Sequence, residues 1–108
     1  MEFKRKGPYL IVSVGKDLDH HQAQMIQKGI RKIQNESGFR HLIFDFHETE
    51  FMDSSGVGMI IGYYKEISAL GGRVAVSGVR SRIEKLFYVS GLHKIIKTYP
   101  EVEDVFHE

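Results

Sequence analysis

The fold of this chain is decided by His41-Leu-Ile-Phe-Asp-Phe46 and, after a short loop, Phe51-Met-Asp-Ser-Ser-Gly-Val-Gly-Met-Ile-Ile-Gly-Tyr-Tyr-Lys-Glu-Ile67. The first segment is too continuously apolar for a strand with one face in water, so we expect a central strand covered on both faces. The second segment carries apolar residues at helical spacing: Val57, Ile60, Ile61, Tyr64 and Ile67. A buried strand that leads into an amphipathic helix is typical of α/β proteins.

On the amino-terminal side, a hairpin and a helix are expected. Residues 3–6 and 9–14 form two extended segments, and Gly7-Pro8 between them supplies the turn. Asp19 then offers an N-cap, with Gln22 three residues later, and Gly38 ends the helical pattern. The apolar residues of this predicted helix are Ala23, Ile26, Ile30 and Ile33.

On the carboxyl-terminal side, strands and helices continue to alternate. Gly71-Gly72 is expected to cap the central helix, and residues 73–77 to form the next strand. Residues 81–89 predict a helix, residues 94–98 a short extended segment, and the residues after Pro100 a final helical turn. This alternation predicts a mostly parallel sheet, in which sites gather at the carboxyl ends of the strands.

Composition limits the classes of function. At 108 residues the chain has the size of one domain, and its 15 basic and 14 acidic residues leave no charge excess for binding DNA or an anionic membrane. The absence of cysteine excludes disulfides and thiolate chemistry and is compatible with a cytoplasmic location. No apolar run is long enough to span a bilayer, and Lys4-Arg-Lys6 before Tyr9-Leu-Ile-Val12 resembles a signal peptide only superficially.

Two adjacent serines, Ser54 and Ser55, lie at the expected start of the central helix. The first backbone N–H groups of a helix have no partner within it and face the positive end of the helix dipole. Ser and Asp are common N-caps, so a purely structural role for this turn stays open. A serine here could instead receive a phosphate, which adds about −1.5 to −2 charge and is tolerated at a helix start.

Enzymatic and metal-binding alternatives are poorly supported. A nucleophile elbow has glycine on both sides of its serine, whereas Met52-Asp-Ser-Ser-Gly56 has glycine on one side only, and the sequence does not establish whether His20 or His21 pairs with a serine. The six histidines lack metal-ligand spacing, and Gly56-Val-Gly58 lacks the lysine of a phosphate-binding loop. We therefore expect no catalytic residue, no metal and no cofactor. Gly58 and Gly62 are instead expected to let the helix backbone approach a neighbouring element.

Five motifs together carry a specific resemblance: Leu18-Asp-His-His21 with Ala23, Phe51-Met-Asp-Ser-Ser-Gly-Val-Gly58, Gly62 with Tyr64-Lys65, Gly71-Gly72, and Ser90-Gly-Leu92 with Lys94-Ile-Ile96. With them the chain resembles the STAS-domain anti-sigma factor antagonists, most closely those of the stage II sporulation type. The resemblance implies one STAS domain over residues 1–108. It also implies a mostly parallel central sheet of about four to five strands, an antiparallel N-terminal strand and three to four helices.

The same resemblance implies a cytoplasmic regulator that binds an anti-sigma factor serine kinase and so releases a sigma factor. Ser55 would be the residue that the kinase phosphorylates, and a serine phosphatase would restore it. Direct DNA binding and membrane association are not expected. The implied partner-binding residues are Asp19, His20, His21, Asp53, Ser54, Ser55, Gly56, Val57, Gly58, Met59, Gly62 and Tyr63.

Two departures from the family pattern leave the partner open. Lys16-Asp17 stands where the family usually has Gly-Glu, and Tyr63 stands where arginine is common. The alternative is a STAS module of a general-stress or other partner-switching assembly with a different kinase. Asp19 could serve only as an N-cap, or could cap its helix and contact the partner at once.

Overall fold

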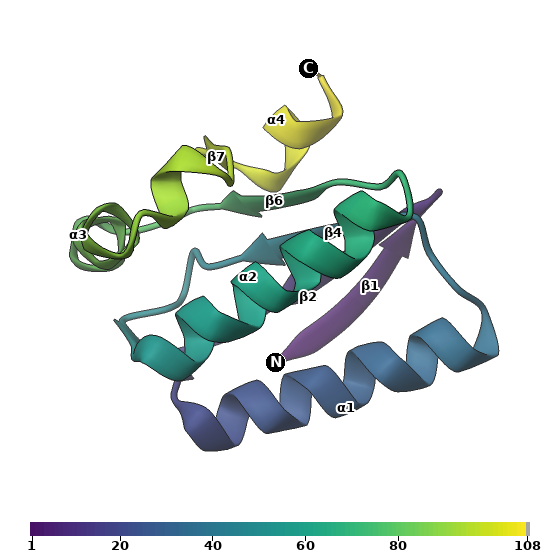
Figure 1. The fold of residues 1–108 in the computed structure, drawn as a ribbon, viewed down its shortest axis with the longest axis horizontal. Coiled ribbons are helices and arrows are strands. Elements are labelled where there is room, and N and C mark those ends of the chain that lie inside the picture. Colours follow the sequence, from purple (N-terminus) through teal and green to yellow (C-terminus); the bar gives the residue numbers. More distant parts are fainter. Residues whose placement is uncertain (108) are drawn as a thin grey trace.

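A five-stranded sheet in the order β1-β2-β4-β6-β7 forms the centre of the molecule in the computed structural model, which describes residues 1–107 (Figure 1). Its strands are β1 (Glu2–Lys6), β2 (Tyr9–Ser13), β4 (His41–Asp45), β6 (Val74–Ser77) and β7 (Thr98–Tyr99). β1 pairs antiparallel with β2, and the other neighbouring strands pair in parallel. The predicted α/β class, the hairpin and the mostly parallel sheet are therefore confirmed.

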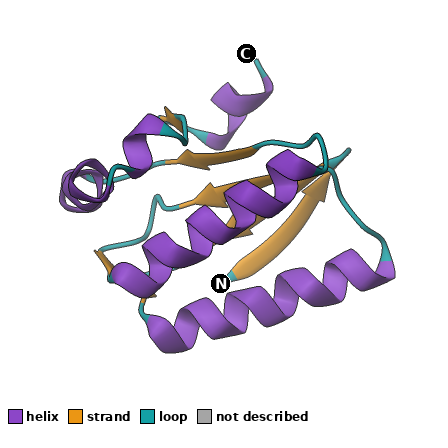
Figure 2. Cartoon of the chain, viewed as in Figure 1, coloured by secondary structure: helices purple, strands orange, loops and turns teal. Residues whose placement is uncertain are grey.

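Four α-helices are present in the described part of the chain: α1 (His20–Glu36), α2 (Ser54–Ala69), α3 (Ser81–Ser90) and α4 (Val102–Phe106). α1 and α2 lie side by side over one face of the sheet and run in the same general direction (Figures 1 and 2). The prediction of an extended segment over residues 94–98 is wrong for the residues before Thr98. Gly91 has a φ of 81° and redirects the chain into a 3₁₀ helix, η1 (Leu92–Lys94), so the strand begins only at Thr98.

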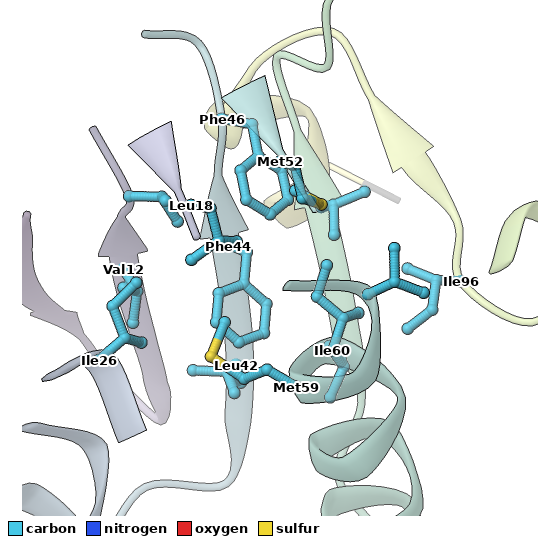
Figure 3. Packing of buried hydrophobic residues seen from close by; sticks show 14 of the residues in the cluster. Val12, Leu18, Ile26, Leu42, Phe44, Phe46, Met52, Met59, Ile60 and Ile96 are labelled. Atoms are coloured by element: carbon cyan, nitrogen blue, oxygen red, sulfur yellow. The ribbon is translucent and has the colours of Figure 1, made fainter. Parts of the chain in front are cut away.

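The central strand β4 is buried on both faces, as its apolar run predicts. Leu42 and Phe44 lie in the larger core with residues of α1 and α2, such as Ile26 and Ile60 (Figure 3). Ile43 points to the opposite face, into a smaller cluster that includes Val105 of α4. This alternation follows from the two-residue period of a strand, because successive side chains leave on opposite sides of the sheet.

The end of α2 confirms the expected glycine cap. Gly71 has a φ of 84°, its N–H donates to the Ser68 carbonyl at 3.0 Å, and the N–H of Gly72 donates to the Ile67 carbonyl at 2.9 Å. These two bonds satisfy carbonyl groups that the last turn of a helix leaves without partners, in the arrangement of a Schellman motif. Gly72 thereby turns the chain toward β6.

A second, two-stranded sheet was not predicted. β3 (Asp17–Leu18) pairs in parallel with β5 (Phe51–Met52), and each of these short strands leads directly into a long helix. We refer to this pair as the β3–β5 ribbon. Because its two strands run in parallel and end together, the ribbon brings the starts of α1 and α2 to the same corner of the molecule (Figure 1).

Candidate functional site

The site lies where α1 and α2 begin, beyond the carboxyl end of the β3–β5 ribbon. The backbone N–H of Asp53 donates to the Leu18 carbonyl at 3.3 Å, which joins the residue before α2 to the strand before α1. Both helix starts therefore direct their unpaired backbone N–H groups and the positive ends of their dipoles into one region. Such a region favours a negative charge placed between the two helices.

Aspartates cap both helices. The Asp19 carboxylate accepts a hydrogen bond from the N–H of Gln22 at 2.9 Å, and the Asp53 carboxylate accepts one from the N–H of Ser55 at 2.9 Å. Neither serine serves as the N-cap of α2, because Ser54 and Ser55 are its first two helical residues. The capping role left open in the sequence thus belongs to Asp53, and the Ser55 hydroxyl is not used for it.

The structure places His20 beside Ser55. The Nδ1 atom of His20, the first residue of α1, lies 3.4 Å from the hydroxyl oxygen of Ser55. Ser55 is half-buried and His20 is exposed, so both groups are reachable from outside. His21, by contrast, lies along a groove on α1 that Gln24 and Lys28 also line. Only one of the two candidate histidines is therefore brought to the serine.

This serine–histidine contact does not complete a catalytic triad. Among the described residues no carboxylate is hydrogen-bonded to His20, and the two cap carboxylates accept from backbone N–H groups instead. A serine nucleophile needs a base that a third group orients. Within residues 1–107, no group of three His, Cys, Asp or Glu side chains is arranged to hold a metal ion.

The glycines of α2 differ in their surroundings. A Cβ atom at Gly58 or Gly62 would meet no atom within 4 Å, and both residues are exposed. No described atom of the domain therefore packs against these two glycines, and their expected approach to a neighbour stays open for a partner element. Gly56 is the glycine that packs tightly, since a Cβ there would lie 2.7 Å from Cγ of Met52 and 2.9 Å from Cδ2 of Leu18.

A shallow groove runs between α1 and α2, starting one turn beyond Ser55. We call it the glycine groove, and it is lined by Gln27, Arg31, Gly58, Met59, Gly62, Tyr63 and Glu66. Burial, and secondarily the charge of Glu66, raises the pKa of Tyr63 to about 12, so its hydroxyl stays protonated at neutral pH. The groove thus offers a flat glycine surface bordered by a neutral phenol and charged side chains.

The predicted partner-binding residues divide by exposure. His20, His21, Ser54, Gly58 and Gly62 are exposed. Asp19, Asp53, Ser55 and Tyr63 are half-buried, whereas Gly56, Val57 and Met59 are buried. Gly56 and Val57 support the surface from beneath, and Met59 contributes to the floor of the groove between α1 and α2.

Sequence reasoning missed two residues of this region. Thr49 is fully buried, and its hydroxyl donates to the Gly15 carbonyl at 2.6 Å, which joins the loops that lead into the two strands of the ribbon. Phe51, at the start of β5, leaves 46% of its surface exposed, and the predicted partner surface did not include it. Thr49 gives no periodic signal because it lies in a short polar loop. Phe51 stands out only through its size.

Replacing Thr49 by valine is expected to destabilise this corner. Thr49→Val keeps the side-chain volume but leaves the Gly15 carbonyl without its donor, which lowers the free energy of unfolding by about 1–3 kcal/mol. Urea unfolding measures this loss, and hydrogen exchange locates it at the ribbon. Thr98→Val, at an exposed position of β7, is the matched control and should change stability by less than about 0.5 kcal/mol. Equal stability of the two variants would contradict the role of Thr49.

The STAS domain family model matches residues 1–105, and the chain therefore belongs to the STAS domain family. An anti-sigma F factor antagonist of Paenibacillus polymyxa is 34% identical over 99 residues, which cover 92% of this chain and 85% of that protein. The resemblance drawn from the sequence motifs is thereby confirmed. Within the described residues, no helix combines the length and apolar character needed to cross a membrane.

Two solved structures extend the comparison. The anti-sigma factor antagonist SpoIIAA in its unphosphorylated form is 25% identical, with a TM-score of 0.85 over 97% of this chain and 91% of that one. The Bacillus cell fate determinant SpoIIAA in its phosphorylated form is also 25% identical, with a TM-score of 0.78 over 98% of this chain and 96% of that one. The chain thus has the STAS fold that its motifs imply.

Proposed function

We propose that this chain is an anti-sigma factor antagonist that binds an anti-sigma factor serine kinase and thereby releases a sigma factor. Phosphorylation of Ser55 by that kinase switches the antagonist off, and a serine phosphatase restores it. The observation that carries the proposal is the Ser55 hydroxyl, which is accessible and not used as a helix cap where two helix starts meet. Relatives named as anti-sigma factor antagonists, one of them solved in a phosphorylated form, support it.

The switch depends on a difference in the cost of the phosphate charge, which is small in the free domain and large in the complex with the partner. Two helix N-termini tolerate the negative charge of a phosphate on Ser55, so the domain stays folded. A partner that has packed an uncharged surface over the same turn must bury that charge, which costs several kcal/mol without a counter-ion. Since 1.4 kcal/mol is tenfold in affinity, a small part of this cost is enough to release the partner.

The partner surface would consist of both helix starts and the glycine groove between α1 and α2. Gly58 and Gly62 lack side chains there, so a partner element could approach the backbone of α2. The protein would act in the cytoplasm as one domain, through protein contacts alone, without DNA, membrane, cofactor or catalysis of its own. Asp19 would combine its observed cap with a partner contact.

Mass spectrometry after incubation with a candidate anti-sigma kinase and ATP tests the proposal. We expect a single added phosphate, mapped to Ser55, and none on Ser55→Ala. Ser54→Ala is the matched control, because Ser54 is the exposed neighbour in the same helical turn, and it should still accept one phosphate. A phosphate on any other residue would overturn the assignment of the switch.

Tyr63 favours an alternative in which the chain has a different kinase partner. It borders the glycine groove where arginine is common in the family, so this chain could belong to a general-stress or other partner-switching assembly with a different kinase. A panel of kinases separates the two: modification only by the kinase of a stress system would favour the alternative. Ser55 would then still be the phosphorylated residue, but the chain would be assigned to a different signalling pathway.

A further inference from the structure

The contact between Ser55 and His20 joins two helices whose residues are 35 positions apart in the chain. Its length of 3.4 Å, from Ser55 Oγ to His20 Nδ1, is loose for a hydrogen bond. Hydrogen bonds between a reacting hydroxyl and its general base are often this long in the free protein and shorten in the reacting complex. The imidazole therefore lies within reach of the proton that Ser55 must lose when it is phosphorylated.

The other polar groups of this corner are already engaged. The carboxylates of Asp19 and Asp53 accept hydrogen bonds from the backbone N–H groups of Gln22 and Ser55. These bonds fix the two helix starts, and they leave the His20 ring as the side chain whose nitrogen faces the Ser55 hydroxyl. His20 is exposed, so its ring can turn slightly to shorten the contact.

We propose that His20 is the proton acceptor for phosphorylation of Ser55, so that the antagonist supplies a catalytic group to the reaction that inactivates it. This inference rests on the proposed function. Ser55 Oγ attacks the γ-phosphorus of the ATP held by the kinase and forms the new O–P bond. The bond from that phosphorus to the β,γ-bridging oxygen breaks, its electron pair leaves with ADP, and the hydroxyl proton passes to Nδ1 of His20.

The same placement would also stabilise the product. After transfer, the phosphoserine carries about −1.5 to −2 charge, and His20 beside it carries the proton as an imidazolium. Opposite charges at this distance stabilise each other, and the two helix N-termini add to the stabilisation. His20 would thus favour the phosphorylated state as well as its formation.

The test is the phosphorylation rate at saturating antagonist. His20→Asn keeps a hydrogen-bond acceptor but cannot take up the proton, so the maximal rate should fall about 100-fold while the dissociation constant for the kinase changes less than about threefold. His20→Gln serves as a second variant should His20→Asn unfold. His107→Asn is the matched control, since His107 is an exposed histidine at the C-terminal end of α4, outside the predicted partner surface, and its rate should equal that of the wild-type chain.

A spectroscopic readout tests whether the imidazole of His20 lies beside the phosphate in the product. In a phosphorus-31 NMR titration, the phosphate of the wild-type chain should lose its second proton at lower pH than the phosphate of His20→Asn, because the imidazolium favours the dianion. Asp19 and Asp53 are the same in both proteins, so their charges cancel in the comparison.

The outcomes are separable. A wild-type maximal rate in both His20 variants would overturn the inference and leave the Ser55 switch intact. A weaker affinity at an unchanged maximal rate would also overturn it, by making His20 a contact residue only. No phosphate on Ser55 of the wild-type chain with active kinases would overturn the proposed function and this role together.

Discussion

Ser55→Asp is expected to weaken binding to the anti-sigma kinase by about tenfold or more, which corresponds to about 1.4 kcal/mol. The aspartate places a permanent negative charge in the first turn of α2, where the helix dipole stabilises it by about 0.3–1 kcal/mol. The free domain should therefore stay as stable as the wild-type protein. The loss falls entirely on the complex, because the partner must bury a charge without a counter-ion.

Calorimetric titration with the purified kinase measures this effect. Ser55→Ala should bind within about threefold of the wild-type chain, since a half-buried hydroxyl is a minor part of the surface. Ser81→Asp is a charge-matched control, because Ser81 is the first residue of α3 and lies at a different helix start. Tight binding by Ser55→Asp would count against the switch, and weak binding by Ser81→Asp would show that the effect is not local.

Gly72→Ala is expected to lower the free energy of unfolding by about 3 kcal/mol or more, at the upper end of single substitutions. A Cβ atom at Gly72 would overlap the Arg40 carbonyl oxygen and lie 2.8 Å from Cγ2 of Ile67. The carbonyl cannot move aside easily, because the N–H groups of Arg40 and His41 are bonded to the Pro8 carbonyl at 2.8 and 3.0 Å. The clash is therefore with backbone that is fixed from two sides.

Gly62→Ala provides the opposite case on the same helix. Nothing lies within 4 Å of a Cβ atom there, so alanine should stabilise the domain by about 0.5–1 kcal/mol through its higher helix propensity. Thermal unfolding compares the two variants, and each kcal/mol shifts the midpoint by about 4–8 °C in a domain of this size. Similar midpoints for Gly62→Ala and Gly72→Ala would refute the packing argument.

Gly62→Ala also bears on the partner surface. If a partner lies against the outer face of α2, the added methyl group weakens binding while it strengthens the free fold. A stabilised variant that binds less well cannot be explained by unfolding.

The sequence predicts the larger elements because their signals are local and long. The continuous apolar run of β4 and the helical periodicity of α1 and α2 are visible without any knowledge of packing, and all three are confirmed. The β3–β5 ribbon was missed because a strand of two residues is too short to show alternation. The extended segment after Ser90 was placed too early because Gly91 begins a 3₁₀ turn that its neighbours do not signal.

The site was predictable in part. The motif around Ser55 indicates a helix start that can accept phosphate, and its role as the phosphorylated residue stays a prediction. The contact of His20 with Ser55 could not be derived, because it depends on how α1 and α2 lie in space. For Gly58 and Gly62 the neighbour stayed unspecified, because a glycine pair in a helix does not reveal which side it faces.

The β3–β5 ribbon makes the surface at Ser55 a discontinuous epitope. A peptide of residues 51–59 contains Ser55 but not His20, which the pairing of β3 with β5 brings to within 3.4 Å of the serine hydroxyl. A kinase that contacts both helix starts would therefore ignore nascent, misfolded or cleaved chains, even though their serine is more accessible. Such a kinase would respond to the concentration of correctly folded antagonist, and proteolysis between the two segments would remove the signal without touching the serine.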